Sequence, residues 1–167
     1  MINKKVIKIS VYGPKPYSMG GHNLSSESCP IRNAIQDIVD DLQDQDKILI
    51  GLTGLSLGLE QDFAYICLQN KIPYNVYLSH DTQERSWADL PEELLKKYQD
   101  LLDEAENHTI INTGAFSPKK ALNRQLRVMK DSDYIIYVSG FLPIKNDKLL
   151  ALLCEKDTKI IPIPIYA

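Results

Sequence analysis

The sequence predicts an α/β fold, Rossmann-like and doubly wound, with a mainly parallel sheet of about six strands and helices on both faces. Segments typical of strands and of helices alternate from one end of the 167-residue chain to the other, and this alternation favours a parallel sheet. The runs ILIGLT (48–53) and YIIYVS (134–139) have no polar face, as expected of strands covered on both sides. A chain of this length predicts a single domain spanning residues 1–167.

The first elements follow from hydrophobic periodicity. The run 6–12 (VIKISVY) is rich in β-branched residues and partly alternating, so it predicts a strand. Residues 30–42 place apolar side chains at steps of three and four, which predicts an amphipathic helix with Ser28 as a possible N-cap. A continuous apolar strand is expected at 48–53, and a helix at 57–70.

The middle of the chain repeats the same alternation. The run 73–78 (PYNVYL) predicts a third strand, and a striped amphipathic helix follows from the N-cap candidate Asp89. Residues 109–112 predict a short fourth strand. A helix is expected over 118–130, because Ser117 supplies a capping hydroxyl and a proline follows it in the first turn.

The last part of the chain predicts a strand at 134–139, a helix at 147–155 and a strand at 159–163. The least regular segments are 13–29 and 79–90. Each follows the carboxyl end of a predicted strand, and ligands in open α/β sheets bind along that edge. We therefore expect a ligand site at the carboxyl edge of the sheet.

Composition excludes several classes of function. The net charge of -3 and pI near 5.6 argue against nucleic-acid binding. No stretch is long and apolar enough for a signal peptide or a membrane span, so a cytoplasmic protein without membrane contact is expected. Isolated histidines and cysteines predict no metal site, no cofactor and free thiols; these residues are His22, His80, His108, Cys29, Cys67 and Cys154.

The stretch GLTGLSLGLE (51–60) joins a predicted strand to a predicted helix. Glycines such as Gly54 and Gly58 let the backbone turn sharply and approach a phosphate, and the helix N-terminus favours an anion. The alternative is a tight turn that needs small residues. Glu60 lies at helical spacing with residues of the inner face, so its side chain is expected to face the sheet. It either stabilises the first helical turn or accepts a hydrogen bond from a ribose hydroxyl.

Two loop segments carry further candidates. The segment 12–23 leaves the first strand through Gly13, two prolines and the pair Gly20 and Gly21, and Lys15 within it either faces a bound anion or is solvated. The segment 79–91 holds the single tryptophan, Trp87. This side chain either stacks on a base or packs the loop onto the core.

A basic stripe is expected on the helix over 118–130. Lys120, Arg124, Arg127 and Asp131 follow one another at steps of four, three and four. Arginine binds phosphate through two parallel hydrogen bonds, so Arg124 is the candidate anion ligand. The alternative is a solvent-facing side of the helix, which we favour for Lys120 and Arg127. On such a stripe, replacing Arg124 by alanine is expected to have little effect on stability.

These segments together resemble the SLOG superfamily of Rossmann-like proteins, in the branch of YpsA-like proteins. The branch motif T-G-x-R-P-x-x-L-G-G is similar to residues 12–21, with Lys15 in place of arginine. The motif S-G-x-A-L-G-x-D is similar to residues 53–60, with Glu60 in place of aspartate, and R-N-x-x-M-V-D-x-S-D is similar to residues 124–133. A glutamine and a tryptophan after the third strand match Gln83 and Trp87.

The resemblance implies binding of a nucleotide or nucleotide-derived small ligand. The ligand-binding residues would be Gly13, Lys15, Gly20, Gly21, Gly54, Gly58, Glu60, Trp87 and Arg124. It also implies a possible homo-oligomer, since members of the superfamily associate through helices.

The chain also departs from the superfamily pattern. The cytokinin-activating hydrolases of this superfamily carry an arginine that Arg124 matches, and a later loop P-G-G-x-G-T-x-x-E. This chain reads SGFLPIKN at 139–146, without that glycine pair or glutamate. Binding without turnover is therefore expected, and whether the protein is an enzyme, and with which catalytic residues, stays open. The alternatives are a nucleotide N-glycoside hydrolase that uses Arg124 and Glu60, and a partner-binding protein that has lost the ligand.

Overall fold

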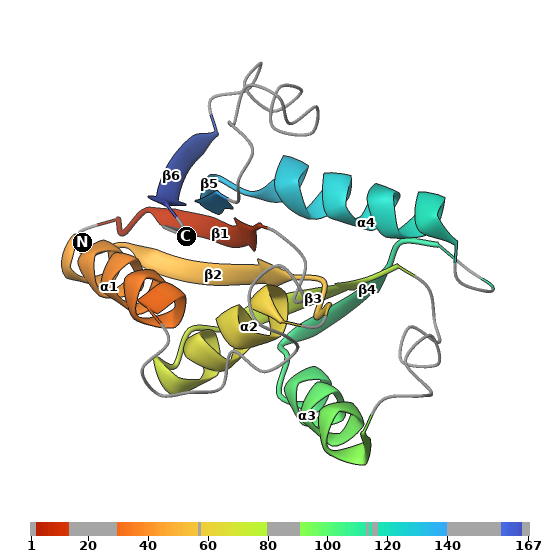
Figure 1. Cartoon of the computed structure of the whole chain (residues 1–167). Coiled ribbons are helices and arrows are strands. Elements are labelled where there is room, and N and C mark those ends of the chain that lie inside the picture. Colours follow the sequence, from red (N-terminus) through yellow and green to blue (C-terminus); the bar gives the residue numbers. More distant parts are fainter. Residues whose placement is uncertain are drawn as a thin grey trace.

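The computed structural model describes residues 3–13, 30–56, 58–79, 91–112, 114, 117–139 and 158–164. Within these ranges the chain forms one six-stranded sheet and four helices (Figure 1). The strands are β1 (Val6–Tyr12), β2 (Ile48–Thr53), β3 (Tyr74–Leu78), β4 (Asn107–Ile110), β5 (Tyr134–Ser139) and β6 (Lys159–Pro164). The helices are α1 (Pro30–Asp44), α2 (Leu59–Gln69), α3 (Glu92–Asp103) and α4 (Pro118–Asp131).

All neighbouring strands are parallel, and their order is β4-β3-β2-β1-β5-β6. This confirms the predicted Rossmann-like α/β class. The chain first builds outward from β1 to β4 and then returns to place β5 on the other side of β1. The strand order therefore reverses at β1, which puts the switch point between β1 and β5.

The same order decides which face each helix covers. Crossovers between parallel strands are right-handed, so helices that precede and follow the reversal lie on opposite faces. Helices α1, α2 and α3 cover one face, and α4 lies across the other (Figure 1). The packing agrees, since α2 contacts β1, β2 and both flanking helices, while α4 contacts β1 and β3.

The main core lies between the sheet and the layer of α1, α2 and α3, and a smaller cluster lies on the α4 side. Gly51 shows how closely α2 approaches the sheet. A Cβ atom at this position would lie 2.7 Å from the sulfur of Cys67 and 3.1 Å from the Cβ of Tyr74. Cys67 is a free, fully buried thiol, and burial raises its pKa. Glycine at 51 therefore serves helix–sheet packing.

Several element boundaries differ from those expected. Strand β4 begins two residues earlier than the predicted 109–112, because it is an exposed edge strand whose position is set by pairing of Asn107 with Asn75 rather than by an apolar pattern. Ser117 caps α4 as predicted, since its hydroxyl accepts the N–H of Lys120 at 3.2 Å. The expected caps Ser28 and Asp89 and the helix at 147–155 lie outside the described residues. None of the described helices is long and apolar enough to cross a membrane.

Asp131 ties the end of α4 to the sheet. Its carboxylate accepts hydrogen bonds from the hydroxyl of Tyr77 on β3 at 2.7 Å and from the Nε of Arg127 at 3.0 Å. Burial acts to raise the pKa of Asp131, but these hydrogen bonds and the nearby positive charges outweigh it and hold the pKa below its usual value. Burial and the bond to Asp131 raise the pKa of Tyr77 to about 12.

Replacing Asp131 by asparagine should make stability less dependent on pH in the acid range. The folded-state pKa lies below the unfolded value of about 3.9, so the carboxylate stabilises the fold above that pH and the benefit is lost as pH falls through the folded pKa. Denaturant unfolding at neutral pH should show the parent more stable than Asp131→Asn, with the gap closing below about pH 4. The exposed control Asp37→Asn should show no such gap, and a gap independent of pH would contradict this account.

Candidate functional site

The turn between β2 and α2, described at residues 54–56 and 58, lies at the carboxyl edge of the sheet. Thr53 fixes its start, because its hydroxyl accepts the N–H of Leu55 at 3.1 Å and donates to the carbonyl of Glu60 at 3.1 Å. Leu55 has a positive φ of 53° and is fully buried. Gly58 is the N-cap of α2 and has a φ of 90°. This backbone conformation is strained for every residue type except glycine. The predicted glycine turn thus forms, and Gly58 begins the helix.

Glu60 lies in the first turn of α2 and is only 7% exposed, facing the interior as its spacing predicted. Its Oε2 accepts the backbone N–H of Ser56 at 3.0 Å and also the Ser56 hydroxyl. The Nη2 of Arg124 lies 3.4 Å from the same oxygen. The other oxygen, Oε1, is buried and has no hydrogen-bond partner among the described residues.

Arg124 reaches this turn from the opposite face of the sheet. It lies on α4, is 7% exposed, and donates from Nη1 to the carbonyl of Gly54 at 2.7 Å. Its Nη2 lies 3.4 Å from the hydroxyl of Ser56. The guanidinium therefore joins α4 to the β2–α2 turn, and its buried Nε has no partner in the described part of the chain.

The structure gives a different reason for a glycine at position 54 from the one that the sequence indicated. The three atoms nearest to a Cβ placed at this position all belong to the guanidinium of Arg124, and the group would overlap all three. Glycine at 54 therefore makes room for an internal arginine. Close approach of a phosphate is not needed to explain it, and of the two explanations given above this contact supports a turn that needs small residues.

The expected basic stripe on α4 is also corrected. Arg127 is exposed and pairs with Asp131, and Lys120 is partly buried, whereas Arg124 faces inward. The expectation that Arg124→Ala has little effect on stability assumed an exposed arginine. This assumption was wrong, because Arg124 is buried beside Glu60. Removing the cation leaves a buried carboxylate without its charged partner.

Gly13 adjoins the same region. A Cβ at Gly13 would lie 2.8 Å from Cδ2 of Leu59, the first residue of α2, and 2.9 Å from Cβ of Val138 on β5. The start of α2 therefore packs against the carboxyl ends of β1 and β5, where the strand order reverses. Of the predicted ligand-binding residues, the structure brings together Gly13, Gly54, Gly58, Glu60 and Arg124. Lys15, Gly20, Gly21 and Trp87 lie outside the described residues.

Ser56 was missed by the sequence analysis. It contributes both a hydroxyl and a backbone N–H to Glu60 and is partly exposed. Glu60 bonds back to a residue before the helix, as the acid of a capping box does, but that motif pairs residues three apart, whereas Ser56 precedes Glu60 by four and Gly58 is the N-cap. The sequence therefore carries no capping-box pattern that indicates Ser56.

A second charged cluster joins three helices on the other side of α2. Asp62 is 2% exposed, and its Oδ1 lies 2.7 Å from Nη2 of Arg32 on α1 and 3.4 Å from Nζ of Lys97 on α3. Two cations thus share one buried carboxylate oxygen. No pattern in the sequence indicated this cluster, because its members are far apart along the chain. It fixes α2, whose first turn carries Glu60, between its two neighbours.

The site offers hydrogen-bonding groups of both kinds. Oε1 of Glu60 can accept a hydrogen bond from a hydroxyl or amine, and the guanidinium of Arg124 can donate hydrogen bonds to an oxyanion. The positive end of the α2 dipole starts at Gly58 beside them. Among the described residues no group of three histidine, cysteine, aspartate or glutamate side chains comes together to hold a metal ion.

Comparison with known proteins assigns no family. No protein-family model matches the chain, and no curated protein matches it. Among solved structures, it is similar to DNA processing protein A (DprA) of Streptococcus pneumoniae, with a TM-score of 0.38 and 11% identity. The similarity covers 93% of this chain and 58% of that one, so this chain spans less than two thirds of that protein. A similarity at this level carries no assignment of function.

Arg124→Ala should destabilise the ligand-free protein by about 3–5 kcal/mol, because it leaves the carboxylate of Glu60 buried and unpaired. The double variant Arg124→Ala with Glu60→Gln should recover part of this loss, since the remaining group is neutral. Denaturant unfolding measures both, and Arg127→Ala is the control, with an expected loss below about 1 kcal/mol for an exposed pair. Equal losses for Arg124 and Arg127 would place Arg124 outside the interior.

Proposed function

We propose that this protein binds a nucleotide or nucleotide-derived small ligand at the carboxyl edge of the sheet, without turnover. The observation that carries the proposal is that one ion pair at this edge leaves two buried atoms without a partner among the described residues, Oε1 of Glu60 and Nε of Arg124. A buried polar atom without a partner costs about 1–3 kcal/mol, and such atoms are few in native structures. A ligand that carries both a hydroxyl donor and an oxyanion satisfies both atoms.

Nucleotides carry these two groups together. A ribose hydroxyl donates to a carboxylate oxygen such as Oε1 of Glu60, and a phosphate accepts from a guanidinium. The start of α2 beside Gly58 adds backbone N–H groups and a positive dipole. Its packing on Gly13 and Val138 sets this helix terminus over the switch point, where ligands of open α/β sheets bind.

The motif resemblance to the YpsA-like branch of the SLOG superfamily supports the same proposal and adds further residues to the site. Under it, Lys15, Gly20, Gly21 and Trp87 complete the site together with the five residues that the structure brings together. The absence of the P-G-G-x-G-T-x-x-E loop from residues 139–146 supports binding rather than hydrolysis. The partner we propose is a small molecule and not a nucleic acid or a membrane.

One observation favours a second candidate, hydrolysis of a nucleotide N-glycosidic bond. Arg124 and Glu60 lie 3.4 Å apart, and the related hydrolases use an arginine and a glutamate. Glu60, however, is held by Ser56 and Arg124 through one oxygen, so only Oε1 is available to a substrate. We rank hydrolysis second for this reason.

Nucleoside monophosphates and their derivatives should raise the melting temperature of the parent. A ligand at about 100-fold excess over its Kd stabilises the native state by about 2.7 kcal/mol. Glu60→Gln should weaken binding by about tenfold or more, because a hydrogen bond to a charged group contributes roughly 1.5–3 kcal/mol. Thermal melting and calorimetric titration measure both. Arg127→Ala is the matched control, because it removes an exposed arginine of the same helix and should leave the affinity unchanged.

Two results would contradict this proposal. Absence of stabilisation by every nucleotide of the panel would favour a protein that has lost the ligand. Release of free base, abolished by Glu60→Gln and retained by Arg127→Ala, would assign hydrolysis instead.

Replacing Gly58 by valine tests whether the turn itself forms the site. The positive φ of 90° strains any β-branched residue and shifts the start of α2. We expect both a lower melting temperature and loss of nucleotide stabilisation. Gly114 is the control, since its φ is also positive, at 83°, and among the described residues a Cβ there would meet only the side-chain end of Lys120. Gly114→Val should lower stability and leave binding intact, whereas unchanged binding by Gly58→Val would exclude the turn.

A further inference from the structure

The amino edge of the sheet, opposite the proposed ligand site, is stepped. Ile9 of β1 is paired with Gly51 of β2 and with Tyr134, the first residue of β5, and Gly51 is paired with Tyr74, the first residue of β3. Three earlier pairs of β1 and β2 therefore extend beyond the starts of β3 and β5. At about 3.3 Å per residue, this extension is roughly 10 Å long. We call residues 4–8 and 46–50 the β1–β2 projection.

The β1–β2 projection is both basic and apolar. Lys5 and Lys8 are exposed, and Val6 and Ile48, which pair with each other, are 46% and 44% exposed. Lys4 is paired with Asp46 at 2.6 Å. This surface stands out in a chain whose net charge is -3.

The lysines at and beside the β1–β2 projection create a positive potential at Tyr134, the first residue of β5. The ammonium groups of Lys47 and Lys159 lie 5.1 Å and 5.4 Å from its ring centroid, and Lys47 donates to its hydroxyl at 3.0 Å. The hydrogen bond from Lys47 and the charges of Lys47, Lys159 and Lys5 lower the pKa of Tyr134 against the effect of burial. Besides Asp46, Asp133 is an acid close to the projection, and its carboxylate accepts the backbone N–H of Lys8.

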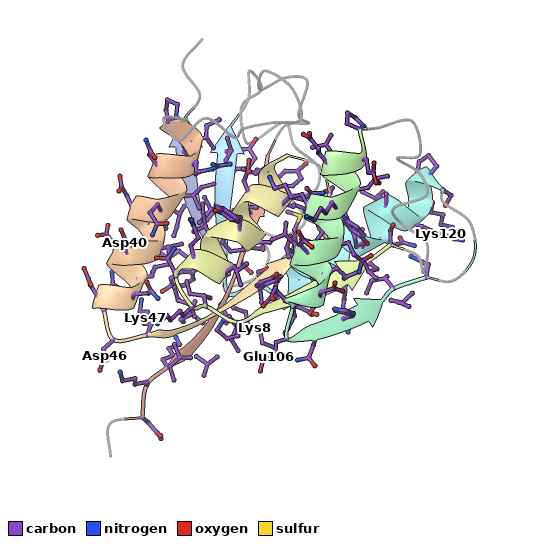
Figure 2. All side chains as sticks on the ribbon, turned by 90° about the horizontal axis from the view of Figure 1, so that it is seen from below. Lys8, Asp40, Asp46, Lys47, Glu106 and Lys120 are labelled. Atoms are coloured by element: carbon purple, nitrogen blue, oxygen red, sulfur yellow. The ribbon has the colours of Figure 1, made fainter. Side chains whose placement is uncertain are left out.

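The other half of the same edge, at the starts of β3 and β4, carries acidic side chains around a depression in the surface. A hollow of about 340 Å³ lies at the starts of β3 and β4. It is lined by apolar and aromatic side chains, two glutamates and one lysine: Leu68, Ile72, Pro73, Tyr74, Glu104, Glu106 and Lys71. We call this the acidic hollow. Figure 2 shows Asp46, Lys47, Lys8 and Glu106 along one side of the molecule, with Lys120 of α4 away from them.

We propose that the amino edge of the sheet is a two-fold interface between two copies of this chain, in which the β1–β2 projection of each copy docks on the acidic hollow of the other. A two-fold axis normal to the sheet, passing between β2 and β3, exchanges β1 with β4. It brings Lys5, which precedes β1, to Glu106, which precedes β4. The projecting half of one edge then fills the receding half of the other.

Charge complementarity favours a second copy of this chain as the partner at the amino edge. One edge carries a basic end and an acidic end with apolar side chains between them, and rotation about the axis sets each end against its opposite. Every contact occurs twice, because the interface is isologous. A nucleic acid would fit the lysines but would be repelled by Glu104 and Glu106 on the same edge. The interface lies at the opposite edge from Glu60 and Arg124, so it is independent of the proposed ligand.

Charge exchange across the axis tests the proposal. The parent should form a dimer in sedimentation velocity that weakens with added salt. Lys5→Glu and Glu106→Lys, each alone, should raise the dimer dissociation constant by about tenfold or more, since each converts two attractions into two repulsions. An equimolar mixture of the two variants should restore dimers, because Lys5 of one meets Glu106 of the other and the two introduced charges also attract.

The matched controls are Lys119→Glu and Glu93→Lys, exposed charges at the starts of α4 and α3. Both should leave the dimer unchanged, and circular dichroism should confirm that all variants are folded. Glu106→Gln provides a milder variant and should weaken the dimer less than Glu106→Lys. A monomeric parent, a dimer indifferent to both exchanges, or a mixture that fails to restore dimers would overturn the proposal. Binding of a single-stranded oligonucleotide by a monomer, lost in Lys5→Glu and kept in Glu106→Lys, would overturn it in favour of a polyanion site.

Discussion

The contact between Arg124 and the β2–α2 turn is the interaction on which the rest of this edge depends. The guanidinium crosses from α4 to the other face of the sheet, bonds to the carbonyl of Gly54 and pairs with Glu60. Burying two opposite charges is costly, and their attraction offsets that cost only with good geometry and further hydrogen bonds. Ser56 supplies such bonds to Glu60. The turn therefore has one arrangement, and α4 is held to it.

The glycines of the β2–α2 segment follow from this packing. Gly51 lets Cys67 of α2 approach the sheet, Gly54 leaves space for the guanidinium, and Gly58 supplies a positive φ at the helix start. Each is explained within the protein, before any ligand is considered. Packing among the described residues leaves several buried polar atoms without a hydrogen-bond partner, and two of them, Oε1 of Glu60 and Nε of Arg124, belong to one ion pair at this edge. For that reason the proposed function depends on these atoms and not on a glycine motif.

The two edges of the sheet differ in chemistry. The carboxyl edge gathers a helix terminus, a buried ion pair and the reversal of strand order. The amino edge carries exposed lysines, exposed aliphatic side chains and an acidic hollow. Parallel strands produce this separation, because all of their carboxyl ends meet at one edge and all of their amino ends at the other. The proposed ligand site and the proposed interface between copies therefore lie at opposite edges, and a substitution at one edge leaves the residues of the other unchanged.

The sequence by itself determined the α/β class, the six strands, and the inward direction of Glu60, because apolar periodicity and strand–helix alternation are local properties of the chain. It placed the cap of α4 at Ser117 for the same reason. It could not place β4, an exposed strand whose register depends on pairing with β3. Nor could it show that Arg124 is buried while Arg127, three residues later, is exposed. The two lie three residues apart on one helix, and only the packing of α4 on the face of the sheet decides which one meets Gly54 and Glu60. The cluster of Arg32, Asp62 and Lys97 likewise exists only in the tertiary structure, since three separate helices bring its charges together.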